Sequence, residues 1–115
     1  MAFAPEQCHI RAMDKRLAML EGLITSGKAD SFTWYALALE YKSKGRIDDA
    51  LDTFSTLRKN DPSYIPMYLM AGAMLTRAGR NEDARDWLKE GIEKANAAGN
   101  THARDEMKKL LDSIA

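Results

Sequence analysis

The chain has 115 residues, and its 17 basic and 17 acidic side chains give a formal net charge of zero at pH 7. This length favours a single domain, and the balanced charge argues against a nucleic-acid-binding protein, which normally carries a basic excess. No apolar run reaches the length of about 18 residues that a membrane-spanning helix requires. The N-terminal residues do not resemble a secretory signal, and the single cysteine, Cys8, cannot form an internal disulfide. We therefore expect a cytoplasmic protein with no membrane partner.

Residues 1–9 show no periodic apolar pattern, and we expect them to be flexible. Cys8 and His9 are adjacent, but a zinc site needs further ligands and His102 is the only other histidine. We therefore predict no metal site.

A first helix is expected over residues 10–27. Its apolar positions are spaced by three and four residues and so share one face: Met13, Leu17, Leu20, Leu23 and Ile24. Gly27 is expected to end this helix, and Asp30 or Ser31 to be the N-cap of the next one.

Residues 31–64 predict two amphipathic helices joined by a glycine turn. The first has an apolar stripe of Trp34, Leu37, Ala38 and Tyr41, and the second one of Ile47, Ala50, Leu51, Phe54 and Leu57. Gly45 is expected to adopt a positive φ at the end of the first helix. Asp48 and Asp49 suit the positive end of the second helix, which should end before Pro62.

Residues 65–98 repeat this arrangement. The segment from Gly45 to Ala50 returns from Gly79 to Ala84, which is 34 residues later. The two stripes are now Tyr68, Ala71, Gly72 and Leu75, and then Ala84, Leu88, Gly91 and Ile92. Small residues among them are expected to let helix backbones approach closely.

A last helix is expected over residues 101–115, with Thr101 as its cap and Met107, Leu110, Leu111 and Ile114 as its apolar face. Pairs of helices cannot bury their own apolar faces alone. We therefore expect the helices at 10–27 and 101–115 to cover the two ends of the repeats.

The repeat resembles the tetratricopeptide repeat, whose period is about 34 residues. The first unit matches the family pattern at Trp34, Leu37, Tyr41, Ala50, Phe54 and Pro62, with Ala38 in place of a glycine. The second unit departs from it, with Tyr68 for tryptophan, Leu75 for tyrosine and Leu88 for phenylalanine. The resemblance implies an all-α, tetratricopeptide-type α-solenoid, a right-handed superhelical stack of about six antiparallel helices within one domain at residues 10–115.

The resemblance also implies a concave groove that binds a protein or peptide partner, as in a scaffold or adaptor. The residues expected to line it are Phe32, Tyr35, Leu39, Lys42, Leu69, Ala73, Thr76 and Arg77. A clamp for a partner's terminal carboxylate is not expected, because Tyr35, Leu39 and Met70 stand where chaperone-binding members carry donors. The alternative is a self-associating module that forms a homodimer through the groove or through Trp87. A separate possibility is that no groove is open to a partner, because the last helix folds over it or because the apolar patch is too small to bind one.

Two features are left open. Trp87 lies beside the core residue Leu88 and is expected to point partly outward, toward the last helix or another chain. Met67, Met70 and Met74 form a stripe that either packs against the next repeat or offers an adaptable binding surface. No catalytic or cofactor site is predicted, because the acidic residues fall in first turns and on solvated faces.

Overall fold

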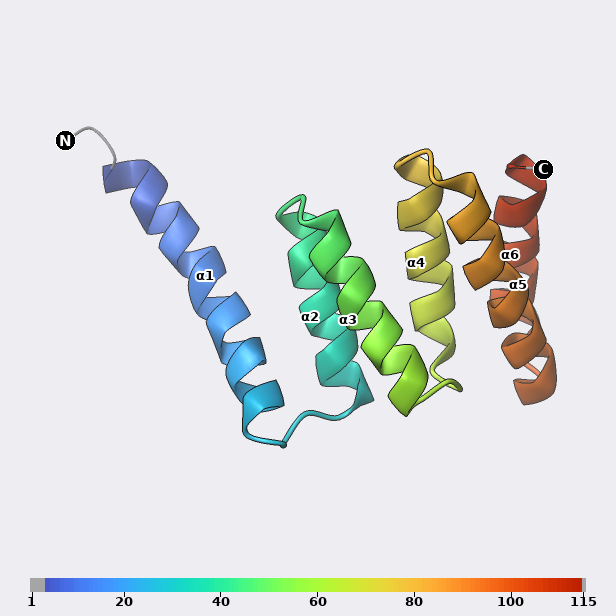
Figure 1. The fold of residues 1–115 in the computed structure, drawn as a ribbon, viewed down its shortest axis with the longest axis horizontal. Coiled ribbons are helices and arrows are strands. Elements are labelled where there is room, and N and C mark those ends of the chain that lie inside the picture. The colour runs from blue at the N-terminus through green and yellow to red at the C-terminus, as the bar shows by residue number, and fades with distance from the viewer. Residues whose placement is uncertain (1–3, 115) are drawn as a thin grey trace. The chain divides into compact units, whose positions relative to one another are not determined.

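A computed structural model describes residues 4–114 of the chain, with side chains from residue 15 onward. These residues form six α-helices and no strand (Figure 1), which confirms the all-α prediction. The helices are α1 (Ala4–Thr25), α2 (Ser31–Ser43), α3 (Ile47–Asn60), α4 (Ile65–Arg77), α5 (Asn81–Ala98) and α6 (Thr101–Ser113). The chain divides into two compact units, with the boundary between Thr53 and Phe54 inside α3. The single domain at residues 10–115 stays a prediction.

In the first unit, α1 and α2 contact each other and run in opposite directions (Figure 1). Leu17 and Leu20 of α1 are buried, as their spacing predicts. α1 begins at Ala4, although flexible chain was expected through residue 9. Pro5 explains part of the difference, since its fixed φ suits the first helical turn. The side chains of Cys8, His9 and Met13 lie outside the described residues.

Asp30 is the N-cap of α2. Its Oδ1 accepts a hydrogen bond of 2.9 Å from the backbone N–H of Thr33 and a second of 2.8 Å from the Thr33 hydroxyl. These bonds favour the carboxylate and lower the pKa of Asp30. Of the two candidate caps, Asp30 and Ser31, the structure therefore selects Asp30.

The glycine turns are as predicted. Gly45 has a φ of 76° and Gly79 a φ of 77°. At the first turn the N–H of Arg46 bonds the carbonyl of Tyr41 at 2.9 Å, and the N–H of Gly45 bonds that of Lys42 at 3.0 Å. This pair of bonds is the Schellman motif, which pairs the last carbonyls of a helix.

A buried tyrosine joins α1 and α2. The Tyr41 hydroxyl donates a hydrogen bond of 2.7 Å to Oε2 of Glu21 on α1. Burial of the phenol, followed by the hydrogen bond and charge of Glu21, raises the pKa of Tyr41 to about 12. Trp34, which was expected on the packed side of α2, is only half-buried.

In the second unit, α4 contacts α5 and α6, and α5 contacts α6. Successive helices are antiparallel (Figure 1). A Cβ added at Gly91 would lie 2.5 Å from both the Met107 sulfur and the Tyr68 Cβ. A Cβ at Gly72 would lie 2.5 Å from Cδ2 of Leu88. The small residues therefore do permit the close approach expected from the sequence.

Trp87 is only 5% exposed, so the expectation that it points outward is wrong. Its ring packs against Tyr68 with a centroid separation of 5.9 Å, and edge-on against Phe54 at 6.4 Å. The guanidinium of Arg58 stacks 3.9 Å from the Trp87 ring centre. Residues from α3 and α4 thus surround the indole, and so little of it is exposed that it is a poor contact surface for a second chain.

Two smaller points complete the second unit. Met67 and Met74 are buried, which favours the packing interpretation for these two, whereas Met70 is half-buried. α6 is capped by Asn100 rather than by Thr101, because the Asn100 side chain accepts a hydrogen bond of 3.1 Å from the N–H of Ala103. Thr101 is instead the first residue of the helix.

Candidate functional site

An open hollow of about 390 Å³ lies between α4 and α6 in the second unit. Its α4 side consists of Leu69 and Ala73, which are one helical turn apart and so share a face. Its α6 side consists of Glu106, Lys109, Leu110 and Ser113. The structure therefore brings two of the expected groove residues together with α6, the helix that the sequence analysis considered as a cover for the groove.

The side chains around the hollow combine apolar and charged groups. Leu69, Ala73 and Leu110 are half-buried and form an apolar floor, while Glu106 and Lys109 are exposed beside it. The Ser113 hydroxyl donates a hydrogen bond of 2.6 Å to the Leu110 carbonyl. The hollow thus presents apolar surface with one carboxylate and one ammonium at its rim.

Two expected groove residues of α4 do not line the hollow. The Thr76 hydroxyl donates a hydrogen bond of 2.8 Å to the carbonyl of Gly72, which engages it within its own helix. Arg77 is exposed in the last turn of α4. Both residues lie C-terminal to Ala73 along α4, beyond the part of the helix that faces the hollow.

The other four expected residues lie on α2 in the first unit. Phe32 is 65% exposed, which is unusual for a large apolar side chain. Tyr35, Leu39 and Lys42 are half-buried. Their spacing of three and four residues places all four on one face of α2. This face is thus partly accessible, and its role in binding stays a prediction.

The α6 residues of the hollow were not identified from the sequence. Leu110 was assigned to the packed face, and Glu106, Lys109 and Ser113 were given no role. The sequence signal that could have identified them is the order of the helices: α6 follows α5 as α4 follows α3, so α6 stands where the first helix of a further repeat would stand. Met107 is fully buried, so it marks the packed face of α6 and leaves the hollow residues on the adjacent face.

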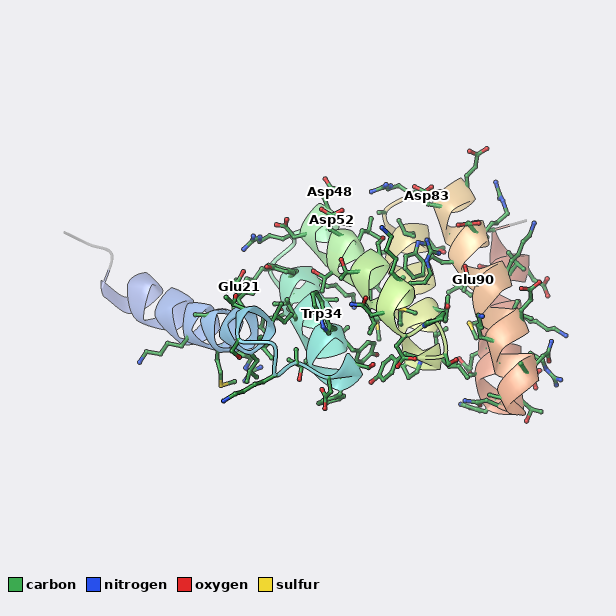
Figure 2. All side chains as sticks on the ribbon, turned by 60° about the horizontal axis from the view of Figure 1, so that its bottom comes forward. Glu21, Trp34, Asp48, Asp52, Asp83 and Glu90 are labelled. Atoms are coloured by element: carbon green, nitrogen blue, oxygen red, sulfur yellow. The ribbon has the colours of Figure 1, made fainter. Side chains whose placement is uncertain are left out.

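The described side chains include no group of three His, Cys, Asp or Glu residues that would hold a metal ion. Within the same residues, no helix has the length and apolar character to cross a membrane. Asp48 and Asp52 of α3 and Asp83 of α5 are exposed (Figure 2), and none of them lines the hollow.

No family model matches the sequence, and no curated protein matches it. Solved structures do match. A tetratricopeptide repeat domain protein from Salinibacter ruber is 33% identical, with 74% of this chain and 96% of that chain covered and a TM-score of 0.68.

Two further structures match almost the whole chain at low identity. PcrH, solved in complex with the chaperone binding region of PopD, is 16% identical with a TM-score of 0.79, covering 98% of this chain and 86% of that chain. The Yersinia enterocolitica type III secretion translocator chaperone SycD is 18% identical with a TM-score of 0.78, covering 98% of this chain and 79% of that chain. These two show the shared fold.

The Salinibacter match carries the assignment of family. At 33% identity over nearly all of that protein, it agrees with the 34-residue period and with the helix–glycine turn–helix units seen here. The chain belongs to the tetratricopeptide repeat family.

Proposed function

We propose that this chain is a non-catalytic scaffold or adaptor that binds a segment of a partner protein. The observation that carries the proposal is the hollow between α4 and α6, with its apolar floor of Leu69, Ala73 and Leu110 and its charged rim. Concave apolar surface with a few polar groups is typical of binding sites. The complex of PcrH with the chaperone binding region of PopD supports a protein partner, because the same fold binds a protein segment there.

The size of the hollow favours a segment that inserts side chains. An α-helix is about 10–12 Å across with its side chains, and a volume of about 390 Å³ is too small to enclose one. An apolar side chain of the partner would contact Leu69 and Leu110. Charged neighbours of that side chain would meet Glu106 or Lys109, which would fix the direction of the bound segment.

The face of α2 is proposed as a second contact region. Phe32 offers the most exposed aromatic ring among the described residues, and Tyr35 and Leu39 add accessible apolar surface beside it. Aromatic anchors carry much of the energy of protein interfaces. Lys42 would supply a cation at the C-terminal end of the same face. A cytoplasmic location and the exclusion of nucleic acid and lipid remain predictions from composition.

Peptide selection from a random library displayed on phage tests the proposal. Selected peptides should bind the wild-type chain and lose about tenfold or more in affinity to Leu69→Asp, because a charge would enter the apolar floor. Met19→Asp is the matched control, since Met19 is an apolar side chain on α1 that is 60% exposed. Circular dichroism confirms that both variants are folded. Equal binding to the two variants would contradict the proposed site.

Self-association is the alternative, through the hollow at Leu69 in the second unit or through the exposed Phe32 in the first unit. Light scattering at two protein concentrations separates it from the adaptor. A monomer at both concentrations supports an open site for another protein. A dimer that dissociates in Leu69→Asp but not in Met19→Asp would contradict the adaptor function and support a homodimer.

A further inference from the structure

α6 supplies four of the six residues that line the hollow, so the position of this helix determines its shape. We propose that Arg85 of α5 is a positioning residue for the binding site, an inference that rests on the proposed function. Nη1 of Arg85 donates a hydrogen bond of 3.1 Å to the backbone carbonyl of Ile114. Arg85 thereby ties the last turn of α6 to the first half of α5.

The other attachments of α6 lie elsewhere along the helix. The turn at Gly99, with the Asn100 cap, holds its beginning next to the end of α5. In its middle, Met107 is fully buried and lies against the site where Gly91 has no side chain. Arg85 acts at the opposite end from the turn, because α5 and α6 are antiparallel (Figure 1).

The part of α6 beyond Met107 is the part that needs this attachment. It carries three lining residues, Lys109, Leu110 and Ser113. None of its side chains is buried, nor is that of the C-cap residue Ile114: Leu110, Leu111 and Ile114 are half-buried, and the rest are exposed. Apolar packing therefore holds this stretch less firmly than it holds Met107.

The chemistry of the contact suits this role. The last carbonyls of a helix have no partner within it and form the negative end of the helix dipole. A guanidinium satisfies such a carbonyl with a charge-assisted hydrogen bond, which is stronger than a neutral one. Arg85 is half-buried, so solvent screens this bond less than it would screen one on an open surface.

Hydrogen exchange of backbone amides tests the positioning step without any partner. In Arg85→Gln, amides of residues 109–114 should exchange about three- to tenfold faster, the range expected for loss of one hydrogen bond that is partly exposed to solvent, while those of α4 remain unchanged. Lys89→Gln, an exposed change on the same helix, is the control. Unchanged exchange at residues 109–114 in Arg85→Gln would overturn the inference.

Binding of a phage-selected peptide tests the link to the site. Arg85→Gln should weaken its binding about three- to tenfold, with a melting temperature close to that of the wild type, and Arg85→Lys should lie in between. Faster exchange with unchanged binding would overturn the inference and leave the proposed function intact. If the selected peptides are insensitive to Leu69→Asp, the proposed function fails instead. Arg85→Lys retains the positive charge and replaces Arg85→Gln should the latter not fold.

Discussion

α2 and α4 occupy equivalent places in the two repeats, yet they are buried to different extents. α2 matches the family pattern better, but only Leu37, Ala38 and Tyr41 are buried in it, and Trp34 is half-buried. α4 has Tyr68 in place of the tryptophan and Leu75 in place of the tyrosine of the pattern, and it nevertheless buries six residues. The match to a family pattern is therefore a poor measure of how much a helix contributes to a core.

The neighbours of α4 explain its burial. Both α5 and α6 contact it, and Tyr68 takes the tryptophan's place while packing against Trp87. The Tyr68 hydroxyl donates to the Pro62 carbonyl at 2.6 Å and lies 3.1 Å from Oε2 of Glu90, the residue labelled on α5 in Figure 2. Burial, together with the charge and hydrogen bond of Glu90, raises the pKa of Tyr68. The substituted residue has thus become part of a new cluster.

The largest expected difference comes from truncating the two aromatic residues at the equivalent position. Tyr68→Ala should lower the free energy of unfolding by about 3–5 kcal/mol, because it empties a fully buried site. Trp34→Ala should cost about 1–3 kcal/mol, since Trp34 is half-buried. Urea denaturation of both variants measures the two costs. A larger loss for Trp34→Ala would reverse the comparison between α2 and α4.

A methyl group added to a helical glycine should have opposite effects in the two units. Gly91→Ala should destabilise by about 1–3 kcal/mol, because the new Cβ meets Tyr68 and Met107. Gly22 of α1 has no atom within 4 Å of the added Cβ, so Gly22→Ala should stabilise by about 0.5–1 kcal/mol. Thermal melting gives both signs. A stabilising Gly91→Ala would show that α5 and α6 pack more loosely than the structure indicates.

Substitution of the two turn glycines should have the same effect in both units. The difference between the units would then lie in the packing of their helices and not in their turns. Gly45→Val and Gly79→Val each place a β-branched residue at positive φ, with open space around the Cβ. Each should therefore cost at least about 1 kcal/mol from backbone strain alone. Denaturation curves for the pair test this equality. A clear inequality would mean that the turns differ in more than backbone conformation.

Alkaline pH should lower the stability of the first unit, because Tyr41 loses its proton there. The folded pKa of about 12 lies above the ordinary value near 10, so the stabilisation is complete below pH 10 and is lost as the pH rises through 12. Glu21→Gln should lower the pKa of Tyr41, since the acceptor charge is removed. Absorbance titration of the phenol follows this shift against Tyr41→Phe. An unchanged pKa of Tyr41 in Glu21→Gln would show that the hydrogen bond to Glu21 does not contribute to the shift.

Local features were predictable from the sequence, and long-range ones were not. The turns at Gly45 and Gly79 depend on a few consecutive residues, so the pattern identified them. The burial of Trp87 depends on Phe54 and Arg58, which lie about 30 residues earlier on another helix. The hollow was missed in part for the same reason: Leu69 belongs to the repeat, but Glu106 and Lys109 meet it only once α6 packs against α4. Exposed charged residues carry no periodic signal for such a contact.

The chain contains two tryptophans, and each belongs to a different unit. Trp34 is half-buried, whereas Trp87 is enclosed by aromatic rings and by the Arg58 guanidinium. Their fluorescence should therefore differ, with Trp87 emitting at shorter wavelength and changing more on unfolding. Trp87→Phe leaves a fluorophore that reports on the first unit, and Trp34→Phe leaves one that reports on the second. The chain thus has a built-in optical probe for each unit, and comparing the two melting curves shows whether the units unfold together.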